Sequence, residues 1–252
     1  MLLSFREGAD QRMIHTVICG YGHMGKLIAQ AIRNSDDMVI CGILNHHSEI
    51  ALFSRRQRVD LLFDFSHPDA FALAQRFVHH SGCALLSGTT GLSADQQEAL
   101  CALGQSHRVM SSANYSLGVA VMCKLVKQAA QLLRDEFDME IIELHHQDKQ
   151  DAPSGTARQL LEVIDPDQQY EALTGRNGMI GRRGKEVGIH AVRGGTLAGE
   201  HTVLFLGEDE KLTIHHTAIS RKIFVNGALK AARWLLNQGN GFYTIEQMIG
   251  GN

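Results

Sequence analysis

The sequence lacks the features that mark several classes of protein. It holds 24 lysine and arginine residues against 27 aspartate and glutamate residues, which leaves no basic excess to attract nucleic acid or an anionic membrane surface. No uninterrupted apolar run approaches the roughly 20 residues that a membrane-spanning helix needs. We therefore expect a protein that binds neither nucleic acid nor membrane.

Cysteine is scarce, and its five positions include no CxxC pair and no spacing typical of metal ligands. Fourteen histidines are present, but their four adjacent pairs lack the i, i+4 helical spacing of metal-binding histidines. We predict no metal site, reduced cysteines and a cytoplasmic location. Residues 1–12 lack the apolar centre of a signal peptide and are expected to form a short disordered leader.

A glycine-rich turn follows the first apolar run of the chain. Residues 16–19 are typical of a strand, and a helical pattern starts with Leu27 and Ile28. Between them lies a Gly-x-Gly-x-x-Gly turn, the pattern that brings backbone close to a pyrophosphate. A plain strand-to-helix turn is the alternative, but the position in a first βα unit favours dinucleotide binding. The predicted cofactor residues are Gly20, Tyr21, Gly22, His23, Met24 and Gly25.

Strand-like runs then alternate with helical patterns up to about residue 116. The polar segments 66–68, 87–91 and 111–116 each follow a strand, and open α/β sheets bind ligands at that edge. Residues 13–116 are therefore predicted to form a Rossmann-type, doubly wound parallel sheet. A helix at 223–236, with Trp234 in the core, is expected to return to it, so that residues 222–252 complete this domain.

The alternation of strands and helices stops after a helix predicted at 117–133 from its periodic apolar residues. Three strand-like runs, at 187–193, 200–206 and 211–217, follow one another without a helix between them. This pattern predicts a second, α+β domain at 117–221 with a mostly antiparallel or mixed sheet. Residues 165–185 are rich in glycine and arginine and are expected to be a loop, either a flap or a solvated connection.

The second strand ends at Asn45, where an NAD-selective site usually places a carboxylate on the adenosine ribose. Without that carboxylate there is no charge repulsion against a 2′-phosphate, and Lys26 or His46 could lie near it. The alternative is an ordinary polar loop. We expect NADPH to be tolerated, so that the cofactor is NADPH and/or NADH.

The densest group of chemical side chains lies at 143–157, between a strand-like run and a helical pattern. It holds His145, His146 and Lys149, and Gly155 and Thr156 open the following helix. Imidazoles, an ammonium group and free helix N–H groups suit an anionic substrate that must also receive a proton. A lone histidine near a strand end is more often a hydrogen-bonded surface residue, but the whole group together favours catalysis.

The segment 143–157 closely resembles the motif of the 4-hydroxy-tetrahydrodipicolinate reductase (dihydrodipicolinate reductase) family. The resemblance runs from Ile14 across nearly the whole chain. It includes Asp-Phe-Ser-His-Pro at 64–68, Ser-Gly-Thr-Thr-Gly at 87–91, Ala-Asn-Tyr-Ser at 113–116 and Gly-Glu-His-Thr at 199–202. The glycine turn is one residue shorter than in the commonest version, and Asn45 replaces the acidic ribose-binding residue.

The resemblance implies a homotetrameric, NAD(P)H-dependent reductase of lysine and diaminopimelate biosynthesis that acts on a cyclic dicarboxylate. By motif match, His145 is the general acid and Lys149 orients the substrate and assists protonation. His146, Gly155 and Thr156 match the positions that hold the substrate carboxylates. Further cofactor-binding positions are Asn45, Gly88, Thr89, Thr90, Ser112, Ala113, Asn114 and Tyr115, with Tyr115 in place of the aromatic residue near the nicotinamide.

Two other functions compete with this one. A related Rossmann dehydrogenase acting on a diamino acid or aspartate keeps the glycine turn but need not keep both histidines, Lys149 and the Pro-Ser-Gly-Thr turn together. A nicotinamide-sensing binding protein is expected to lose the proton donor or to gain a protein-binding extension, and the sequence has neither feature.

Overall fold

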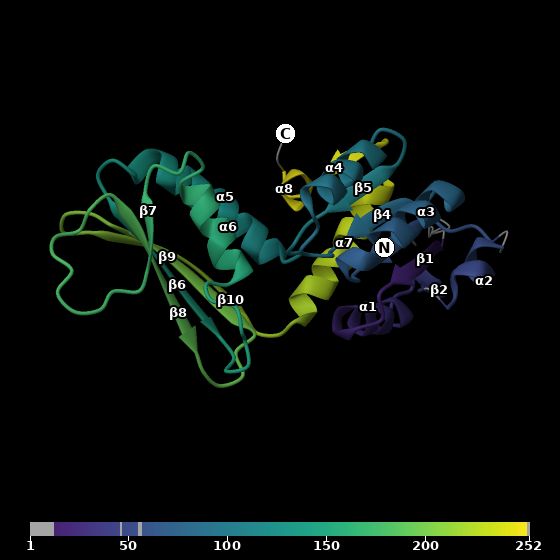
Figure 1. The fold of residues 1–252 in the computed structure, drawn as a ribbon, viewed down its shortest axis with the longest axis horizontal. Helices are drawn as coiled ribbons and strands as arrows, with labels where there is room; N and C mark the ends of the chain where they lie inside the picture. The colour runs from purple at the N-terminus through teal and green to yellow at the C-terminus, as the bar shows by residue number, and fades with distance from the viewer. Residues whose placement is uncertain (1–12, 46, 55–56, 251–252) are drawn as a thin grey trace, which may run out of the picture. The chain divides into compact units, whose positions relative to one another are not determined.

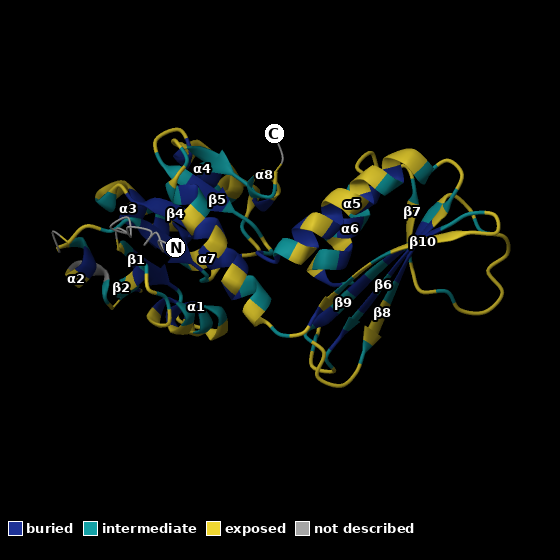
Figure 2. Cartoon of the chain, turned by 180° about the vertical axis from the view of Figure 1, so that it is seen from behind, coloured by how far each residue is buried: buried dark blue, intermediate teal, exposed yellow. Residues whose placement is uncertain are grey.

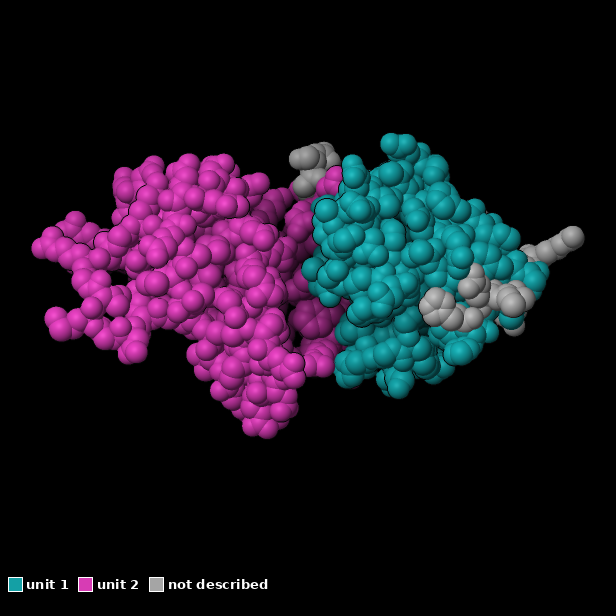
Figure 3. Space-filling model, in the orientation of Figure 1, with its two compact units in different colours: residues 1–113, 228–244 teal, residues 114–227, 245–252 magenta. Residues whose placement is uncertain are grey.

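The computed structural model describes residues 13–45, 47–54 and 57–250 of the chain. The predicted leader, residues 1–12, and His46 lie outside these residues. The contacts within the chain divide it into two compact units (Figure 3). Unit 1 comprises the described residues up to 113 together with 228–244, and unit 2 comprises 114–227 together with the described residues from 245. No described helix is long and apolar enough to cross a membrane.

Unit 1 is a parallel six-stranded sheet with the strand order β11-β5-β4-β3-β1-β2 (Figure 1). Val17, Leu62 and Leu85 bury one face of the sheet under α3 and α4, and the alternate residues Ile18 and Phe63 are buried on the other face. This is the predicted doubly wound α/β sheet. Its strands are β1 Ile14–Cys19, β2 Met38–Leu44, β3 Leu61–Asp64, β4 Ala84–Ser87, β5 Arg108–Ser111 and β11 Gly241–Tyr243. The helices are α1 His23–Arg33, α2 Glu49–Phe53, the 3-10 turn η1 Pro68–Ala70, α3 Phe71–Ser81, α4 Ala94–Leu103 and the second half of α7 Lys222–Leu236.

Unit 2 contains a mixed five-stranded sheet with the order β10-β9-β6-β8-β7 (Figure 1). β6 and β8 run parallel, as do β7 and β8, whereas β9 is antiparallel to both of its neighbours. Met139, Ile141 and Val203 bury one face against α5 and α6 (Figure 2). The strands are β6 Asp138–His145, β7 Glu171–Thr174, β8 Glu186–Arg193, β9 Gly199–Leu206 and β10 Lys211–Ala218, and the helices are α5 Leu117–Leu133, α6 Gly155–Ile164 and α8 Ile245–Met248.

The structure corrects several details of the sequence-based fold. The segment 165–185 contains the strand β7, which lacks the alternating burial that would have identified it. β11 is a sixth strand of the parallel sheet that was not predicted. Trp234 is half-buried, edge-on to Tyr243, where a core position was expected. Residues 245–250 group with unit 2 because α8 packs on α5, whereas the sequence placed them with the nucleotide domain.

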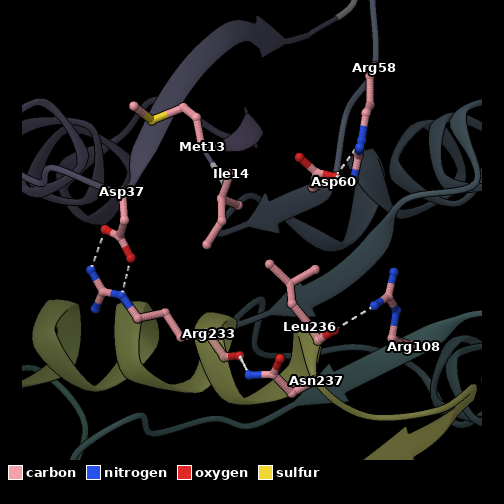
Figure 4. A pocket seen from close by; sticks show the side chains of 9 residues that line it. All are labelled: Met13, Ile14, Asp37, Arg58, Asp60, Arg108, Arg233, Leu236 and Asn237. Atoms are coloured by element: carbon pink, nitrogen blue, oxygen red, sulfur yellow. Dashed lines mark hydrogen bonds and ion pairs between the residues drawn. The ribbon is translucent and has the colours of Figure 1, made fainter. Parts of the chain in front are cut away.

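A hollow of about 490 Å³ lies at the amino ends of the parallel strands in unit 1, opposite the edge where the glycine turn emerges (Figure 4). Charged side chains close its walls. Arg233 on α7 binds Asp37 through two hydrogen bonds of 2.6 and 2.8 Å, and Arg108 donates to the carbonyl of Leu236 at 2.7 Å. These bonds attach the end of α7 to the sheet, so we assign the hollow a structural role.

The Asp37–Arg233 pair predicts a pH-dependent contribution to stability. The hydrogen bond from Arg233 holds the pKa of Asp37 well below its ordinary value, so the pair stabilises the fold above about pH 4 and loses this effect as the carboxyl is protonated at lower pH. Because Arg233 is 43% exposed, we expect Asp37→Asn to cost only about 1 kcal/mol at pH 7.

Urea denaturation at pH 7 and pH 3 measures this contribution. The difference in free energy of unfolding between wild type and Asp37→Asn is expected to be smaller at pH 3 than at pH 7. Asp36→Asn, a change at the exposed neighbouring residue, is expected to alter the free energy of unfolding little at either pH. An equal loss of stability in Asp37→Asn and Asp36→Asn at pH 7 would contradict the role assigned to the Asp37–Arg233 pair.

Candidate active site

The turn between β1 and α1 requires glycine at two positions. Gly20 has a φ of +85°, and a Cβ there would lie 2.5 Å from the carbonyl oxygen of Phe65. A Cβ on Gly25 would lie 2.0 Å from the carbonyl oxygen of Gly20. These two glycines let the turn tighten and let α1 approach the end of β1, as the sequence pattern predicts.

The middle of the turn is open. Gly22 is the residue before α1, and a Cβ built on it would meet nothing within 4 Å. Tyr21 and His23 beside it are exposed, and Met24 is half-buried in the first turn of α1. The first N–H groups of a helix have no intrahelical partner and favour an anion. The residues present therefore fit the pyrophosphate of a dinucleotide.

The segments after β3 and β4 form the neighbouring part of this edge. Asp64 is buried and accepts hydrogen bonds from Ser66 Oγ and Ser87 Oγ at 2.5 and 3.1 Å, while burial raises its pKa. Thr89 Oγ1 accepts from the Ser66 N–H at 3.0 Å, so this buried hydroxyl ties two loops together. Gly88 is half-buried beside the Phe65 ring, and Thr90 is exposed.

Asn45 serves as a turn-forming residue in this structure. Its side-chain oxygen accepts from the backbone N–H groups of His47 and Ser48, at 2.9 and 3.0 Å. This is an Asx-type turn, in which the amide oxygen is used by the loop itself. Asn45 is exposed at the end of β2, where the sequence predicts contact with the ribose.

The predicted cofactor residues 112–115 straddle the boundary between the two units. Ser112 and Ala113 belong to unit 1, whereas Asn114 and Tyr115 belong to unit 2. Asn114 accepts from the N–H of Ser116 at 2.8 Å and donates to Thr156 Oγ1 at 3.2 Å. The side chain of Tyr115 is only 2% exposed, so in this conformation its ring offers little surface to a nicotinamide.

The central group of unit 2 is built on Glu143 and His145. Both lie on the helix-facing side of β6, because residues two apart on a strand share a face. His145 Nδ1 lies 2.5 Å from Glu143 Oε2. Arg193 on β8 binds the same carboxylate through two hydrogen bonds of 2.7 and 2.9 Å, and the N–H of Ser154 donates to it at 3.1 Å. A fully buried carboxylate thus receives hydrogen bonds from three directions.

The charges around His145 act in opposite directions. Burial lowers its pKa, the hydrogen bond and charge of Glu143 raise it, and Lys149 and Arg193 lower it, with a net result below the ordinary value. Burial raises the pKa of Glu143, but the hydrogen bonds from Arg193, His145 and Ser154 lower it by more. The net pKa is below the ordinary value, so this carboxyl is ionised. At neutral pH the free site therefore holds a carboxylate beside a mostly neutral imidazole.

His201 on β9 forms the other wall of this site. Its ring stands edge-on to that of His145, with 5.1 Å between centroids, and its Nε2 lies 3.1 Å from Ser154 Oγ. Burial lowers the pKa of His201 to about 4, so it is neutral. A neutral ring beside His145 adds no repulsive charge when His145 takes up a proton.

Lys149 and His146 are held by different partners from His145. Lys149 Nζ donates to Asp151 at 2.7 Å, and that hydrogen bond lowers the pKa of Asp151. His146 lies just past the end of β6, where its Nε2 is 3.1 Å from a guanidinium nitrogen of Arg221. The structure therefore surrounds this end of β6 with three cationic side chains, those of Lys149, Arg193 and Arg221.

The N-terminus of α6 completes the group. Ser154 is the N-cap residue, and its Oγ accepts from the N–H of Ala157 at 3.1 Å. Gly155 is exposed with open space where a side chain would stand, and Thr156 is half-buried. The helix starts at Gly155 as predicted, and the N–H groups of Gly155 and Thr156 in its first turn have no intrahelical partner and suit an anion.

Sequence reasoning missed four residues of this site: Glu143, Arg193, His201 and Arg221. Glu143 could have been found, since its spacing of two from His145 places both on one face of a strand. His201 lies in the Gly-Glu-His-Thr segment that was noticed without a role. Arg193 and Arg221 reach the site through pairing and packing over 50 and 75 residues, for which no local signal exists.

The described residues contain no group of three or more histidine, cysteine, aspartate or glutamate side chains placed to hold a metal ion. All five cysteines are free thiols. Burial raises the pKa of Cys19 to about 12 and those of Cys83 and Cys123 to about 11, so these three thiols are poor nucleophiles.

Comparisons with known proteins identify the family. The family model "Dihydrodipicolinate reductase, N-terminus" matches residues 14–115, and "Dihydrodipicolinate reductase, C-terminus" matches residues 118–249. The 4-hydroxy-tetrahydrodipicolinate reductase of Methanoregula boonei is 35% identical, over 94% of this chain and 98% of its own. The reductase of that name from Methanosarcina acetivorans is 38% identical, over 94% of this chain and 100% of its own.

Solved structures share the fold. A dipicolinate-bound dihydrodipicolinate reductase from Paenisporosarcina sp. TG-14 has a TM-score of 0.76 at 23% identity, covering 94% of this chain and 99% of its own. A diaminopimelate dehydrogenase of C. glutamicum aligns less well, with a TM-score of 0.54 at 12% identity over 93% of each chain. The family models and the curated relatives together show that this chain belongs to the dihydrodipicolinate reductase family.

Proposed function

We propose that this protein uses NAD(P)H to reduce 4-hydroxy-tetrahydrodipicolinate to tetrahydrodipicolinate, in lysine and diaminopimelate biosynthesis. The observation that carries the proposal is the buried Glu143–His145 pair beside Lys149 and the open N-terminus of α6. These groups suit a reaction that adds a proton to a dianionic ring. A diamino-acid or aspartate dehydrogenase has no need of all of them together.

The substrate is a cyclic dicarboxylate whose 4-hydroxyl leaves as water to give a conjugated double bond. Bound NAD(P)H supplies the hydride. Negative charge then develops in the conjugated system, and His145 gives its proton to the carbon that carries this charge. General acids of this kind typically contribute about 10²–10⁴-fold to the rate. Without the substrate, His145 is mostly neutral; two bound carboxylates raise its pKa and protonate it where the proton is needed.

Lys149, His146, Gly155 and Thr156 hold the two carboxylates in this proposal. The ammonium of Lys149 and the N–H groups at the start of α6 neutralise charge that would otherwise oppose the arriving hydride. Arg221 supports the same role, since it donates to His146 and adds a positive charge beside it. The bond between Lys149 and Asp151 keeps the ammonium in place until a carboxylate replaces Asp151 as its partner.

We place the cofactor on the turn formed by Gly20, Tyr21, Gly22, His23, Met24 and Gly25, with Asn45, Gly88, Thr89, Thr90, Ser112, Ala113, Asn114 and Tyr115 along the same strand ends. The open backbone at Gly22 and the start of α1 support this assignment. Tyr115 contacts the nicotinamide only if its side chain becomes more exposed than it is here.

NADPH is the cofactor we propose, with NADH also accepted. The support is electrostatic: Asn45 is neutral, and its amide oxygen is already used by the loop at the end of β2. A 2′-phosphate approaching this position meets no carboxylate on Asn45, whereas the acidic residue usual in NAD-selective sites would repel it.

We also propose a homotetramer and a cytoplasmic location. The sheet face of unit 2 that points away from α5 and α6 carries half-buried Ile142, Leu144 and Leu204, and Val192 on the same face is 47% exposed. An apolar strip of this kind is typical of a surface covered by another subunit. Five free thiols suit a reducing compartment.

The first prediction from this proposed function concerns the acid and the ammonium. His145→Gln and Lys149→Ala are each expected to lower kcat by about 10²-fold or more, while the Kd for NADPH, measured by fluorescence titration, changes little. His190→Gln is the matched control, because it removes another histidine that is bonded to a glutamate of the same sheet.

Activity is followed as loss of reduced-nicotinamide absorbance with freshly formed 4-hydroxy-tetrahydrodipicolinate. Oxidation in its presence, and none with diaminopimelate or aspartate, separates the reductase from a related dehydrogenase. A sensing protein gives no turnover with any of them. Unchanged turnover in both variants rules out the proposed roles.

The second prediction concerns cofactor choice. Asn45→Asp keeps an acceptor oxygen for His47 and Ser48 but adds a negative charge where we place the ribose. We expect KM for NADPH to rise about fivefold or more relative to KM for NADH, because one charge–charge contact of this kind is worth about 1 kcal/mol or more. An equal change for both cofactors would place Asn45 away from the 2′-phosphate.

The third prediction concerns assembly. Val192→Asp puts a charge on the uncovered face of the unit 2 sheet and is expected to dissociate the tetramer, as measured by sedimentation velocity. Leu132→Asp is the control, because Leu132 is 83% exposed on α5 and away from that face. A monomeric wild-type protein would refute the proposed tetramer.

A further inference from the structure

Glu143 has no exposed surface, yet four donor groups surround it. Arg193 donates through both terminal nitrogens, Ser154 through its backbone N–H, and His145 Nδ1 lies at 2.5 Å. A bidentate guanidinium is the strongest neutral-pH partner of a buried carboxylate. The arrangement is stable only while Glu143 stays ionised, because a protonated carboxyl would leave the half-buried guanidinium of Arg193 without its counter-charge.

An ionised carboxylate fixes the tautomer of His145. It can only accept hydrogen bonds, so Nδ1 must carry the hydrogen that points at Glu143. In the neutral imidazole, Nε2 is then the nitrogen with the free lone pair. The proton that His145 takes up and gives away is therefore on Nε2.

Nε2 of His145 lies beside a glycine, Gly199. A Cβ built on Gly199 would lie only 2.8 Å from Nε2, so any side chain at this position would crowd that nitrogen. Gly199 also has a φ of +153°, which residues other than glycine rarely adopt. One ring nitrogen of His145 is thus held by Glu143, while glycine at position 199 keeps a side chain away from the other.

We propose that Glu143, held by Arg193, is a positioning residue that keeps the hydrogen of His145 on Nδ1 and so makes Nε2 the proton donor. The proposal rests on the proposed role of His145 as the acid. Glu143 does not touch the substrate; it acts through the imidazole. Its negative charge also favours the imidazolium that must form before the proton is given away.

The other groups that face His145 determine the sign of the pH effect. Lys149 and Arg193 are cations that oppose protonation of His145, and neutral His201 on β9 adds no charge. Glu143 is the carboxylate that favours it. The alkaline limb of kcat marks loss of the acid, because activity falls as pH rises through the pKa of His145. Without the charge of Glu143 that limb must move to lower pH.

A purely structural role is the competing explanation, since Glu143 also joins β6 to β8 and to the start of α6. The chain offers a matched control on the opposite face of the same strand. Glu140 accepts two hydrogen bonds from Arg176, at 2.8 and 2.9 Å, and lies 2.7 Å from Nε2 of His190. Like Glu143 it is paired with arginine and histidine, but its histidine is His190 and not His145.

The experiment compares Glu143→Gln with Glu140→Gln by the pH profile of kcat and by urea denaturation. Both variants are expected to lose stability. Only Glu143→Gln is expected to lower kcat, by roughly 10–100-fold as for other partners that orient an imidazole, and to move the alkaline limb about one unit or more to lower pH. Glu143→Asp keeps the charge and is expected to keep the limb near its wild-type position.

A loss of kcat that is equal at every pH, with the limb unmoved, would reduce Glu143 to a structural residue and overturn the proposal. So would an equal shift in Glu140→Gln. If Glu143→Gln does not fold, a second measurement, made on the wild-type protein, tests the proposal.

That measurement is the ring ¹⁵N spectrum of wild type, with the His145 signals assigned from the spectrum of His145→Gln. We expect hydrogen on Nδ1 and a free Nε2 in the neutral form, and the opposite tautomer would overturn the proposal without reference to activity. If His145→Gln turns over normally while the Nδ1–H tautomer is found, the proposed acid is wrong but the positioning stands. The two failures are therefore distinguishable.

Discussion

The site in unit 2 depends on the cost of burying one negative charge. Glu143 has no contact with solvent, and a buried carboxylate is tolerated only with opposite charge and hydrogen-bond donors around it. Those donors come from β8, from the start of α6 and from the end of β6 itself. Meeting this requirement fixes the distance between α6 and the sheet, and it leaves the N-terminus of α6 next to His145. The need to neutralise this buried carboxylate thus assembles the substrate site that we propose, although Glu143 does not contact the substrate in that proposal.

The architecture of both units could be predicted because their longer elements have regular apolar patterns. α5 and β10 begin and end within a residue of the predicted runs. The errors concern short elements whose stability comes from distant partners. β11 has three residues and exists through its pairing with β5, more than 130 residues earlier in the chain. β7 pairs with β8 while most of the side chains of β7 remain exposed. Neither β7 nor β11 therefore has an alternating hydrophobic pattern by which the sequence would identify it.

The candidate site was predictable to the extent that its residues are contiguous. His145, His146, Lys149, Gly155 and Thr156 lie within twelve residues, and the structure keeps them at one end of β6 and the start of α6. Arg193 and His201 arrive from β8 and β9, and only the register of the sheet brings them to Glu143. That register depends on the burial of alternate residues in β6, β8 and β9 together, so no single segment of the sequence reveals it.

The two glutamates of β6 show why residue type and pairing alone do not identify a residue that positions an imidazole. Each binds an arginine in bidentate fashion and lies beside a histidine. Glu143 meets Nδ1 of a histidine two residues along its own strand, which turns the distal nitrogen, Nε2, away from the carboxylate. Glu140 meets Nε2 of a histidine on the neighbouring strand, so the distal nitrogen is the one already engaged. The imidazole tip is free for proton transfer only in the first arrangement, and a Glu-x-His pair at the end of a strand is the local pattern that produces it.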